Sequence, residues 1–184
     1  MHFTTPRLIV RPFEPADAPA VIPLWGDADA MRFLGNGEPW VVDEPSAAAC
    51  IDRSRAYYHE HPGYGFFAVE LKAHGFLAGH IALKPLGADE VEVGWLVDSR
   101  YRGQGIASEA ARAMLRHGFE TLGLDQIVAV MVPENTASRR VAERLGMVYQ
   151  GTRPERGSTV AWYRLERTAF EEQQPDARRG VGSE

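Results

Sequence analysis

Apolar residues follow two periods along the chain, and the alternation between these periods predicts the order of the elements. Segments with the helical period of about 3.6 residues lie near residues 15–25, 106–122 and 136–145, and another runs from a cap at Asp43 or Ser46 to about Tyr58. Short apolar segments bounded by Gly, Pro or polar residues have the length of strands; they cover residues 8–10, 65–70, 76–83, 90–97, 126–132 and 159–165. This order predicts an α/β fold.

The connections between these segments predict how the strands pair. Between residues 65 and 97 the connections are short and contain Gly, which is typical of antiparallel hairpins. The helix predicted at 106–122 separates the strands at 90–97 and 126–132, and a strand–helix–strand order brings two strands together in parallel. We therefore expect a mixed sheet in which a meander is followed by one parallel unit.

The composition indicates one globular domain. With 184 residues, 45% of them hydrophobic and 24% charged, the chain has the size and balance of a single folded unit with a sizeable core. We predict that this domain covers residues 1–170. The segment 171–184 contains only Ala177 and Val181 as apolar residues, which is typical of a disordered tail.

Charge and cysteine content exclude several classes of partner. A formal net charge of −5 argues against nucleic acid, because binding phosphates needs a surplus of Lys and Arg on one face. Cys50 is the single cysteine, so the chain forms no internal disulfide and no cysteine-based zinc cluster. No apolar run approaches the ~18 residues of a membrane span, and the opening lacks the features of a secretory signal. These features predict a cytoplasmic protein that binds neither nucleic acid nor a membrane.

Other side chains suggest chemistry that a simpler interpretation explains. His59 and His61 have no further His or Cys close to them in sequence, so we expect no metal site. No His or basic cluster flanks Cys50 to activate it as a nucleophile. Several aromatic residues of the first half either line a pocket for an amine or belong to the core; they are Trp25, Trp40, Tyr57 and Tyr58.

The segment Arg100-Tyr101-Arg102-Gly103-Gln104-Gly105 connects the strand at 90–97 to the helix that begins at Ile106. Its glycines permit a tight turn and the close approach of a ligand, while the helix amino terminus and the two arginines favour an anion. The segment therefore predicts a diphosphate site, although an ordinary strand-to-helix turn with solvated arginines explains these residues equally well. Its spacing differs from that of a nucleotide P-loop and from that of a dinucleotide fingerprint.

Further motifs occur in a fixed order around this segment. The chain reads Glu92-Val93-Gly94-Trp95, Arg100-x-x-Gly103-x-Gly105-Ile106-Ala107-x-Glu109-Ala110, Asn135-x-x-Ser138 and Leu145-Gly146-Met147, after an opening Thr5-Pro6-Arg7-Leu8-Ile9-Val10-Arg11-Pro12-Phe13. Together these motifs resemble the GNAT superfamily of acetyl-CoA-dependent N-acetyltransferases, and most closely its RimJ/RimL-type branch, over residues 5–167. The resemblance implies a mixed, splayed sheet of about six to seven strands flanked by helices, whose fourth and fifth strands diverge to admit the pantetheine arm.

The resemblance also implies where acetyl-CoA binds. The pyrophosphate lies on residues 102–106 and the thioester beside Gly94, where a bulge, a close approach by the ligand or simple packing each explain a glycine inside a strand. Asn135 contacts the coenzyme arm or only caps the helix that follows, and an arginine of that helix lies near the phosphates or in solvent. The predicted cofactor-binding residues are Trp95, Leu96, Val97, Arg102, Gly103, Gln104, Gly105, Ile106, Ala107, Asn135, Arg139 and Arg140.

Two residues are candidates for proton transfer. The alternation of the strand places Glu92 on the same face as Gly94, where it can help to deprotonate an amine, unless it is an ordinary solvent-facing residue. Many relatives have a Tyr seven residues after the motif Asn, but this position is Ala142 here. The resemblance implies instead that Ser138 assists the departing thiolate, whereas a Ser near a helix start commonly bonds to the backbone and water can supply the proton.

These features lead to one function and to rivals that the sequence leaves open. We predict an acetyl-CoA-dependent N-acetyltransferase in which a primary amine attacks the thioester directly. The acceptor is a protein N-terminus, a polyamine or a small-molecule amine, and the resemblance is also compatible with a homodimer. The rivals are a non-catalytic acyl-CoA-binding regulatory module with the same fold and an enzyme that transfers a longer acyl group.

Overall fold

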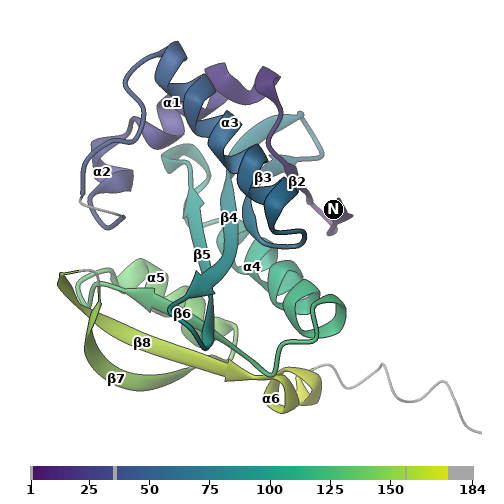
Figure 1. The fold of residues 1–184 in the computed structure, drawn as a ribbon, viewed down its shortest axis with the longest axis vertical. Coiled ribbons are helices and arrows are strands. Elements are labelled where there is room, and N and C mark those ends of the chain that lie inside the picture. Colours follow the sequence, from purple (N-terminus) through teal and green to yellow (C-terminus); the bar gives the residue numbers. More distant parts are fainter. Residues whose placement is uncertain (1, 35–36, 156, 174–184) are drawn as a thin grey trace, which may run out of the picture.

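The computed structural model describes residues 2–34, 37–155 and 157–173. Within these residues, eight strands form a sheet in the order β1-β2-β3-β4-β5-β6-β8-β7 (Figure 1). The strands are β1 Phe3–Thr4, β2 Leu8–Pro12, β3 Gly65–Leu71, β4 Phe76–Leu86, β5 Glu90–Val97, β6 Gln126–Met131, β7 Val148–Glu155 and β8 Ser158–Glu166. Neighbouring strands are antiparallel except β5 and β6, which are parallel. The predicted mixed sheet with one parallel unit is therefore confirmed.

Helices flank this sheet in two groups. The helices are α1 Ala18–Trp25, α2 Ala28–Met31, α3 Glu44–Glu60, α4 Ile106–Arg116, α5 Thr136–Arg144 and α6 Arg167–Glu172. Figure 1 shows α1, α2 and α3 together at one end of the molecule, while α4 and α5 lie against the middle and the second half of the sheet. The helices of the first half of the chain thus gather at one end of the sheet, and α4 and α5 of the second half lie against the rest of it.

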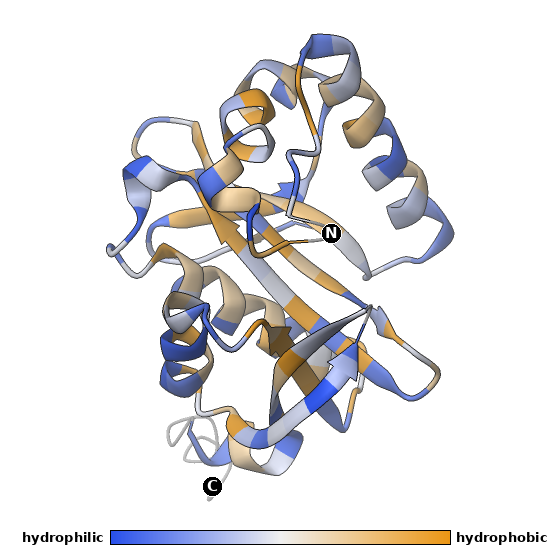
Figure 2. Ribbon diagram, turned by 90° about the vertical axis from the view of Figure 1, so that its left-hand side faces the viewer, coloured by the Kyte–Doolittle hydropathy of each residue, from blue (hydrophilic) through white to orange (hydrophobic). Residues whose placement is uncertain are grey.

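Alternation along the strands produces two main apolar cores, and a further small cluster contains Val128 and Trp162. In β3, Phe67 packs into the larger core with Met114 of α4, whereas the next residue, Ala68, packs into the smaller core with Val21 of α1. Figure 2 shows that apolar residues concentrate in the central strands and that hydrophilic residues lie on the outward faces of the helices. Both faces of the central strands are covered, which makes these strands a rigid base for a site.

The structure adds two strands, β1 and β7, and two short helices, α2 and α6, to the predicted elements. β1 has two residues and α2 has four, and both are too short to show a period. β7 has the sequence VYQGTRPE, in which Gly and Pro interrupt the apolar pattern. Such residues are tolerated in β7 because it lies at the edge of the sheet and needs a hydrogen-bonding partner on one side only. The sheet consequently has more strands than the six or seven expected.

The long helix predicted at residues 106–122 is divided in the structure. α4 ends at Arg116, and a π-helical turn, His117–Thr121, follows it. A Cβ atom on Gly118 would lie 2.5 Å from the side chain of Ile127, so the backbone of this turn rests directly on β6.

The predicted disordered tail begins inside a helix. Glu171 and Glu172 are the last residues of α6, and Gln173 follows them in a turn. Phe170, which is 1% exposed, holds α6 against the larger core. The remainder of the predicted tail, residues 174–184, lies outside the described residues.

Candidate active site

β5 and β6 pair over a short stretch only and then diverge. Within the described residues, the register between them consists of one pair, Glu92 with Val128, whereas β5 pairs with β4 at eight consecutive positions, from Gly79–Val97 to Leu86–Glu90. A cavity of about 610 Å³ borders β5 on this open side. The splay expected between the fourth and fifth predicted strands is therefore present.

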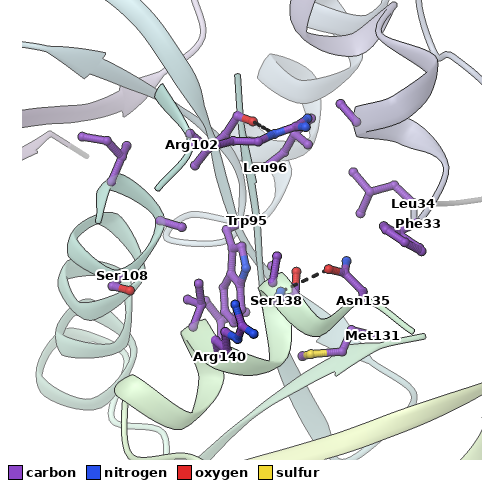
Figure 3. A pocket seen from close by; sticks show the side chains of 18 of the residues that line it. Phe33, Leu34, Trp95, Leu96, Arg102, Ser108, Met131, Asn135, Ser138 and Arg140 are labelled. Atoms are coloured by element: carbon purple, nitrogen blue, oxygen red, sulfur yellow. Dashed lines mark hydrogen bonds between the residues drawn. The ribbon is translucent and has the colours of Figure 1, made fainter. Parts of the chain in front are cut away.

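Five parts of the chain line this cavity, and Figure 3 shows labelled side chains from each of them. The lining residues are Glu92–Val97 of β5; Tyr101, Arg102, Gly103, Gly105, Ile106, Ala107 and Ser108 around the start of α4; Val130 and Met131 of β6; Asn135, Ala137, Ser138, Arg140, Val141 and Arg144 around α5; and Asp29, Ala30, Arg32, Phe33 and Leu34 around α2. Both predicted catalytic residues are among them. Of the predicted cofactor-binding residues, Gln104 and Arg139 are the two that do not line the cavity.

The turn before α4 adopts a backbone conformation that glycine favours. Gly103 and Gly105 have φ angles of +75° and +78°, in the left-handed region, and Gly105 is the N-cap of α4. Within the described residues no side chain caps this helix, so its first amides are available to a ligand. Gln104 lies between the two glycines and donates from its side chain to the carbonyl oxygen of Arg100 at 3.3 Å. The turn thus has the geometry of an anion site at a helix amino terminus.

The two arginines of the turn have different roles in the structure. Arg100 forms an ion pair with Asp98 at 2.7 Å, and this hydrogen-bonded guanidinium lowers the pKa of the Asp98 carboxyl. Arg102 donates to the carbonyl oxygen of Val97 at 3.3 Å and lies 3.8 Å from Asp27, at the edge of the cavity (Figure 3). Arg102 is therefore the arginine of this turn that faces the cavity, and Arg100 holds the preceding turn together.

α5 begins with a side-chain cap. The Oδ1 atom of Asn135 accepts a hydrogen bond from the backbone amide of Ser138 at 3.1 Å, so the capping interpretation of Asn135 is confirmed. This bond uses the Ser138 amide and leaves the Ser138 hydroxyl out of the cap. Arg139 donates to the hydroxyl oxygen of Tyr163 at 3.1 Å and does not line the cavity, whereas Arg140 does. Arg140 is accordingly the arginine of the pair that can reach a ligand in the cavity.

Glu92 and Gly94 lie on the same face of β5. Glu92 is 7% exposed, and its Oε2 atom lies 3.0 Å from the Nζ atom of Lys84 on β4, so it is a buried, paired carboxylate and not a solvent-facing residue. A Cβ atom added to Gly94 would meet no atom within 4 Å, and the register of β4 and β5 is continuous here. The strand therefore has neither a bulge nor a packing contact that requires glycine at this position.

Some cavity residues were not predicted from the sequence. Arg144 follows Arg140 by one helical turn of α5, so helical periodicity combined with the position of Arg140 indicates it. Ser108 reaches the cavity from the first turn of α4, and its buried Oγ atom has no hydrogen-bonding partner among the residues that the structure describes. Phe33 and Leu34 reach it from the segment after α2. No local pattern indicates those two residues, because only the tertiary fold brings this segment to β5.

The two tryptophans of the first half belong to the smaller core, whereas Tyr58 packs against the larger core. Trp25 is 2% exposed and donates from its indole to Nδ1 of His80 at 2.9 Å, and Trp40 stacks on the same imidazole. Burial lowers the pKa of His80 to about 3, so His80 is a neutral acceptor inside the core. Neither tryptophan lines the cavity, and the Sγ atom of Cys50 contacts Arg53 outside it. The core interpretation of both tryptophans is therefore the better one.

The described residues lack a metal-binding cluster and a membrane-spanning helix. They contain no group of three or more His, Cys, Asp or Glu side chains arranged to hold a metal ion. They also contain no helix that is long and apolar enough to cross a membrane.

Comparison with known proteins gives consistent results. A family model described as an acetyltransferase (GNAT) domain matches residues 7–148. The uncharacterized N-acetyltransferase YnaD of Bacillus subtilis (strain 168) is 36% identical over 152 residues, which are 82% of this chain and 85% of YnaD.

Solved structures support the same relationship. The crystal structure of an acetyltransferase (GNAT family) from Bacillus anthracis is 31% identical, with a TM-score of 0.78 over 91% of this chain and 99% of that one. RimL, a ribosomal L7/L12 α-N-protein acetyltransferase in complex with coenzyme A, has a TM-score of 0.76 over 92% of this chain and 99% of its own. At 19% identity the likeness to RimL shows the fold alone.

Proposed function

The chain belongs to the GNAT acetyltransferase family, and we propose that it transfers the acetyl group of acetyl-CoA to a primary amine by direct attack of the amine on the thioester. The observation that carries this proposal is the gap between β5 and β6, which opens beside Gly94 and leads to the glycine turn before α4. A thioester held beside Gly94 would have Glu92 and Ser138 in the same cavity.

The residues at the gap fit acetyl-CoA. A pantetheine arm has two amides, and these suit the edges of two strands that have stopped pairing, because buried backbone groups need hydrogen-bonding partners. The first turn of α4 offers its amides to the diphosphate. Arg102, Arg140 and Arg144 supply positive charge around the cavity, which suits the phosphates of the coenzyme.

Direct transfer requires that the amine lose a proton. The neutral amine attacks the thioester carbonyl carbon, the carbon–sulfur bond breaks, and the thiolate of coenzyme A leaves. Glu92 is the carboxylate that lines the cavity beside Gly94, and we assign to it the proton of the amine, accepted directly or through water. No acyl-enzyme intermediate is needed, and Cys50 lies outside the cavity.

The acceptor enters from the side of the cavity formed by the segment around α2. Phe33 and Leu34 give this side an apolar wall, and Asp29 and Arg32 place one negative and one positive charge on it. We favour an α-amine or a small amine as the acceptor. An α-amine has a pKa of about 8 and is partly neutral near pH 7, so it asks less of a base than a lysine-like amine with a pKa of about 10.4.

Release of coenzyme A thiol tests the function. The enzyme is mixed with acetyl-CoA and a panel of N-terminal peptides, polyamines and small amines, and the free thiol is measured with a chromogenic disulfide. Thiol release that depends on one amine class supports transfer to that class. Coenzyme binding without thiol release across the panel would instead favour the non-catalytic acyl-CoA-binding module.

A glycine substitution tests the binding site. Gly105→Val places a branched side chain at a left-handed position against the guanidinium of Arg7, and we expect it to abolish acetyl-CoA binding in calorimetry. Gly87→Val is the matched control, because Gly87 also has a positive φ, +68°, but lies in the turn between β4 and β5 with no atom within 4 Å of its added Cβ. Equal affinity of the Gly105→Val and wild-type proteins, with the fold intact by circular dichroism, would reject this site.

A further inference from the structure

The turn between β1 and β2 contacts the first turn of α4, although the two are 102 residues apart in sequence. The Thr5 hydroxyl donates to Oε1 of Glu109 at 2.5 Å, and the backbone amide of Arg7 donates to the same atom at 3.0 Å. The Nε atom of Arg7 donates to Oε2 of Glu109 at 2.6 Å. Both carboxylate oxygens of Glu109 are therefore held by the amino-terminal segment.

The same guanidinium also holds the glycine turn. The NH1 atom of Arg7 donates to the carbonyl oxygen of Gln104 at 2.8 Å, and its other terminal nitrogen lies 3.4 Å from the position of a Cβ atom on Gly105. One arginine thus connects the carboxylate of α4 with the peptide between Gln104 and Gly105. Arg7 is 48% exposed in its side chain and Glu109 is 17% exposed, so the contact lies at the rim of the fold.

The position of this contact matters because the turn is intrinsically soft. Gly103 and Gly105 flank Gln104, and glycine loses more conformational freedom on ordering than any other residue. In a trans peptide the carbonyl and the following amide point in opposite directions. When Arg7 fixes the Gln104 carbonyl, it therefore also fixes the Gly105 amide, which points away from Arg7.

We propose that Arg7 is a positioning residue for coenzyme binding, which, through Glu109 and the Gln104 carbonyl, holds the glycine turn in the conformation that receives the diphosphate. The inference rests on the proposed function, because it takes acetyl-CoA to bind at this turn. Arg7 acts through the turn and not through a contact with the coenzyme. The same arrangement assigns a role to Thr5, which orients the Glu109 carboxylate.

Glu109 provides a test whose sign separates this role from simple electrostatics. Burial raises the pKa of Glu109, but the Thr5 hydroxyl and the amide and guanidinium of Arg7 outweigh it and hold this pKa below its ordinary value. Glu109 is thus an anion close to the proposed diphosphate site. If it acted only by its charge, Glu109→Gln would strengthen coenzyme binding. If it holds Arg7 and the turn in place, the same substitution weakens binding.

The experiment compares four variants with the wild-type protein. Acetyl-CoA affinity is measured by calorimetry, steady-state KM and kcat by thiol release, and the fold by circular dichroism. We expect Arg7→Met to raise the dissociation constant about tenfold and Glu109→Gln about threefold, with kcat at saturating acetyl-CoA within about twofold of wild type. Arg7→Lys should recover part of the affinity, because an ammonium can reach the carboxylate or the carbonyl but does not reproduce the planar fork. The fourth variant combines Arg7→Met with Glu109→Gln.

The double variant and a control decide between the explanations. If the two residues act as a unit, the double variant binds no more weakly than Arg7→Met alone. If Arg7 contacts the coenzyme directly, Arg7→Met costs the same factor in both backgrounds, and the positioning role is overturned. Arg116→Met removes an exposed arginine paired with Glu120 at 3.7 Å farther along the same helix and should leave the affinity unchanged.

Further outcomes also contradict the proposal. Tighter or unchanged binding by Glu109→Gln shows that the Arg7–Glu109 contact, which we call the clamp, does not support the glycine turn. Equal affinities of the Arg7→Met and Arg116→Met variants show the same. A wild-type protein that does not bind acetyl-CoA at all refutes the proposed function itself, whereas a wild-type protein that binds, combined with unaffected Arg7 variants, refutes the clamp alone.

Discussion

The two edges of β5 differ sharply in how they pair. Along β4, β5 is paired at eight consecutive positions, whereas along β6 one pair is formed before the strands diverge. The difference appears at two glycines on the facing strands. A Cβ atom on Gly79 of β4 would lie 2.1 Å from the carbonyl oxygen of Leu96, while one on Gly94 of β5 would meet nothing within 4 Å.

These two glycines are explained by different surroundings. Gly79 of β4 packs against the backbone of β5, whereas Gly94 of β5 borders the cavity. At Gly79 the backbone of β5 occupies the space where a side chain would go, so glycine is required by the fold. At Gly94 the space is empty and belongs to the cavity, so the fold does not require glycine there, and this space is what the proposed thioester position needs. Substitutions at the two positions should therefore separate stability from activity.

The largest expected effect is on the closed side. Gly79→Ala forces a methyl group into the backbone of β5, and we expect the free energy of unfolding to fall by about 3 kcal/mol, as for an overpacked core position. Denaturant titration followed by circular dichroism measures this loss. If the variant has wild-type stability, β4 and β5 can separate at this point, and the contrast between the two edges disappears.

On the open side the loss should be catalytic. Gly94→Val fills the space beside the proposed thioester position, and we expect kcat/KM to fall about 100-fold because a displacement of about 1 Å at the reacting atoms costs that much. The unfolding free energy should stay within about 0.5 kcal/mol of wild type. The kcat/KM of Gly94→Ala, which adds one carbon atom instead of three, should lie between those of the wild-type protein and Gly94→Val. Full activity of Gly94→Val would place the thioester elsewhere.

The sequence predicted the regular part of this molecule well for a local reason. Most strands and helices longer than about five residues carry a hydrophobic period, which β5, β6 and α4 follow closely and the edge strand β7 does not. The glycine turn before α4 was also predictable, because a left-handed backbone requires glycine at Gly103 and Gly105. The ordered motifs indicated the family, and the divergence of β5 and β6 was predicted from the resemblance to that family.

What the sequence could not predict depends on contacts between distant segments. Arg139 and Arg140 are adjacent, and the sequence offers no reason to choose between them; the packing of α5 turns Arg139 toward Tyr163 and Arg140 toward the cavity. The clamp from Arg7 to Glu109 joins residues 102 positions apart. Phe33 likewise reaches the cavity only through the tertiary fold. In each case the partner is chosen by the fold and not by the local pattern.

An intermediate effect is expected at Glu92, the position at which β5 pairs with both β4 and β6. Glu92→Gln removes the proposed base, and the rate should fall about 30-fold for a polyamine, whose amine is almost entirely protonated at neutral pH, but about threefold for an α-amine. Thiol release with both acceptors measures the ratio. Equal losses for the two amine classes would show that Glu92 is not the base.

The ion pair with Lys84 needs its own control, because Glu92→Gln also breaks a buried pair. Lys84→Met removes the cation from β4 and keeps the carboxylate on β5. If the loss of activity in Glu92→Gln comes from the broken ion pair, it should be equal for the polyamine and the α-amine. Lys84→Met should then show the same equal loss. If it comes from the lost base, Lys84→Met should leave the ratio of the two acceptors unchanged.

The smallest effect is expected at Ser138, on the wall of the cavity opposite the closed edge. The position at which many relatives have a Tyr is Ala142, which is fully buried in the larger core and offers no acid. The Asn135 cap uses the Ser138 amide, so the Ser138 hydroxyl is not committed to that bond and lines the cavity. If the hydroxyl assists the departing thiolate, Ser138→Ala lowers kcat about fivefold with little change in acetyl-CoA affinity, because the interaction forms mainly in the transition state.

Thr136→Ala, which removes an exposed hydroxyl in the same helical turn, is the control for altered helix propensity. Single-turnover measurements are needed so that chemistry and not product release is observed, and a wild-type rate for Ser138→Ala under those conditions would identify water as the source of the proton.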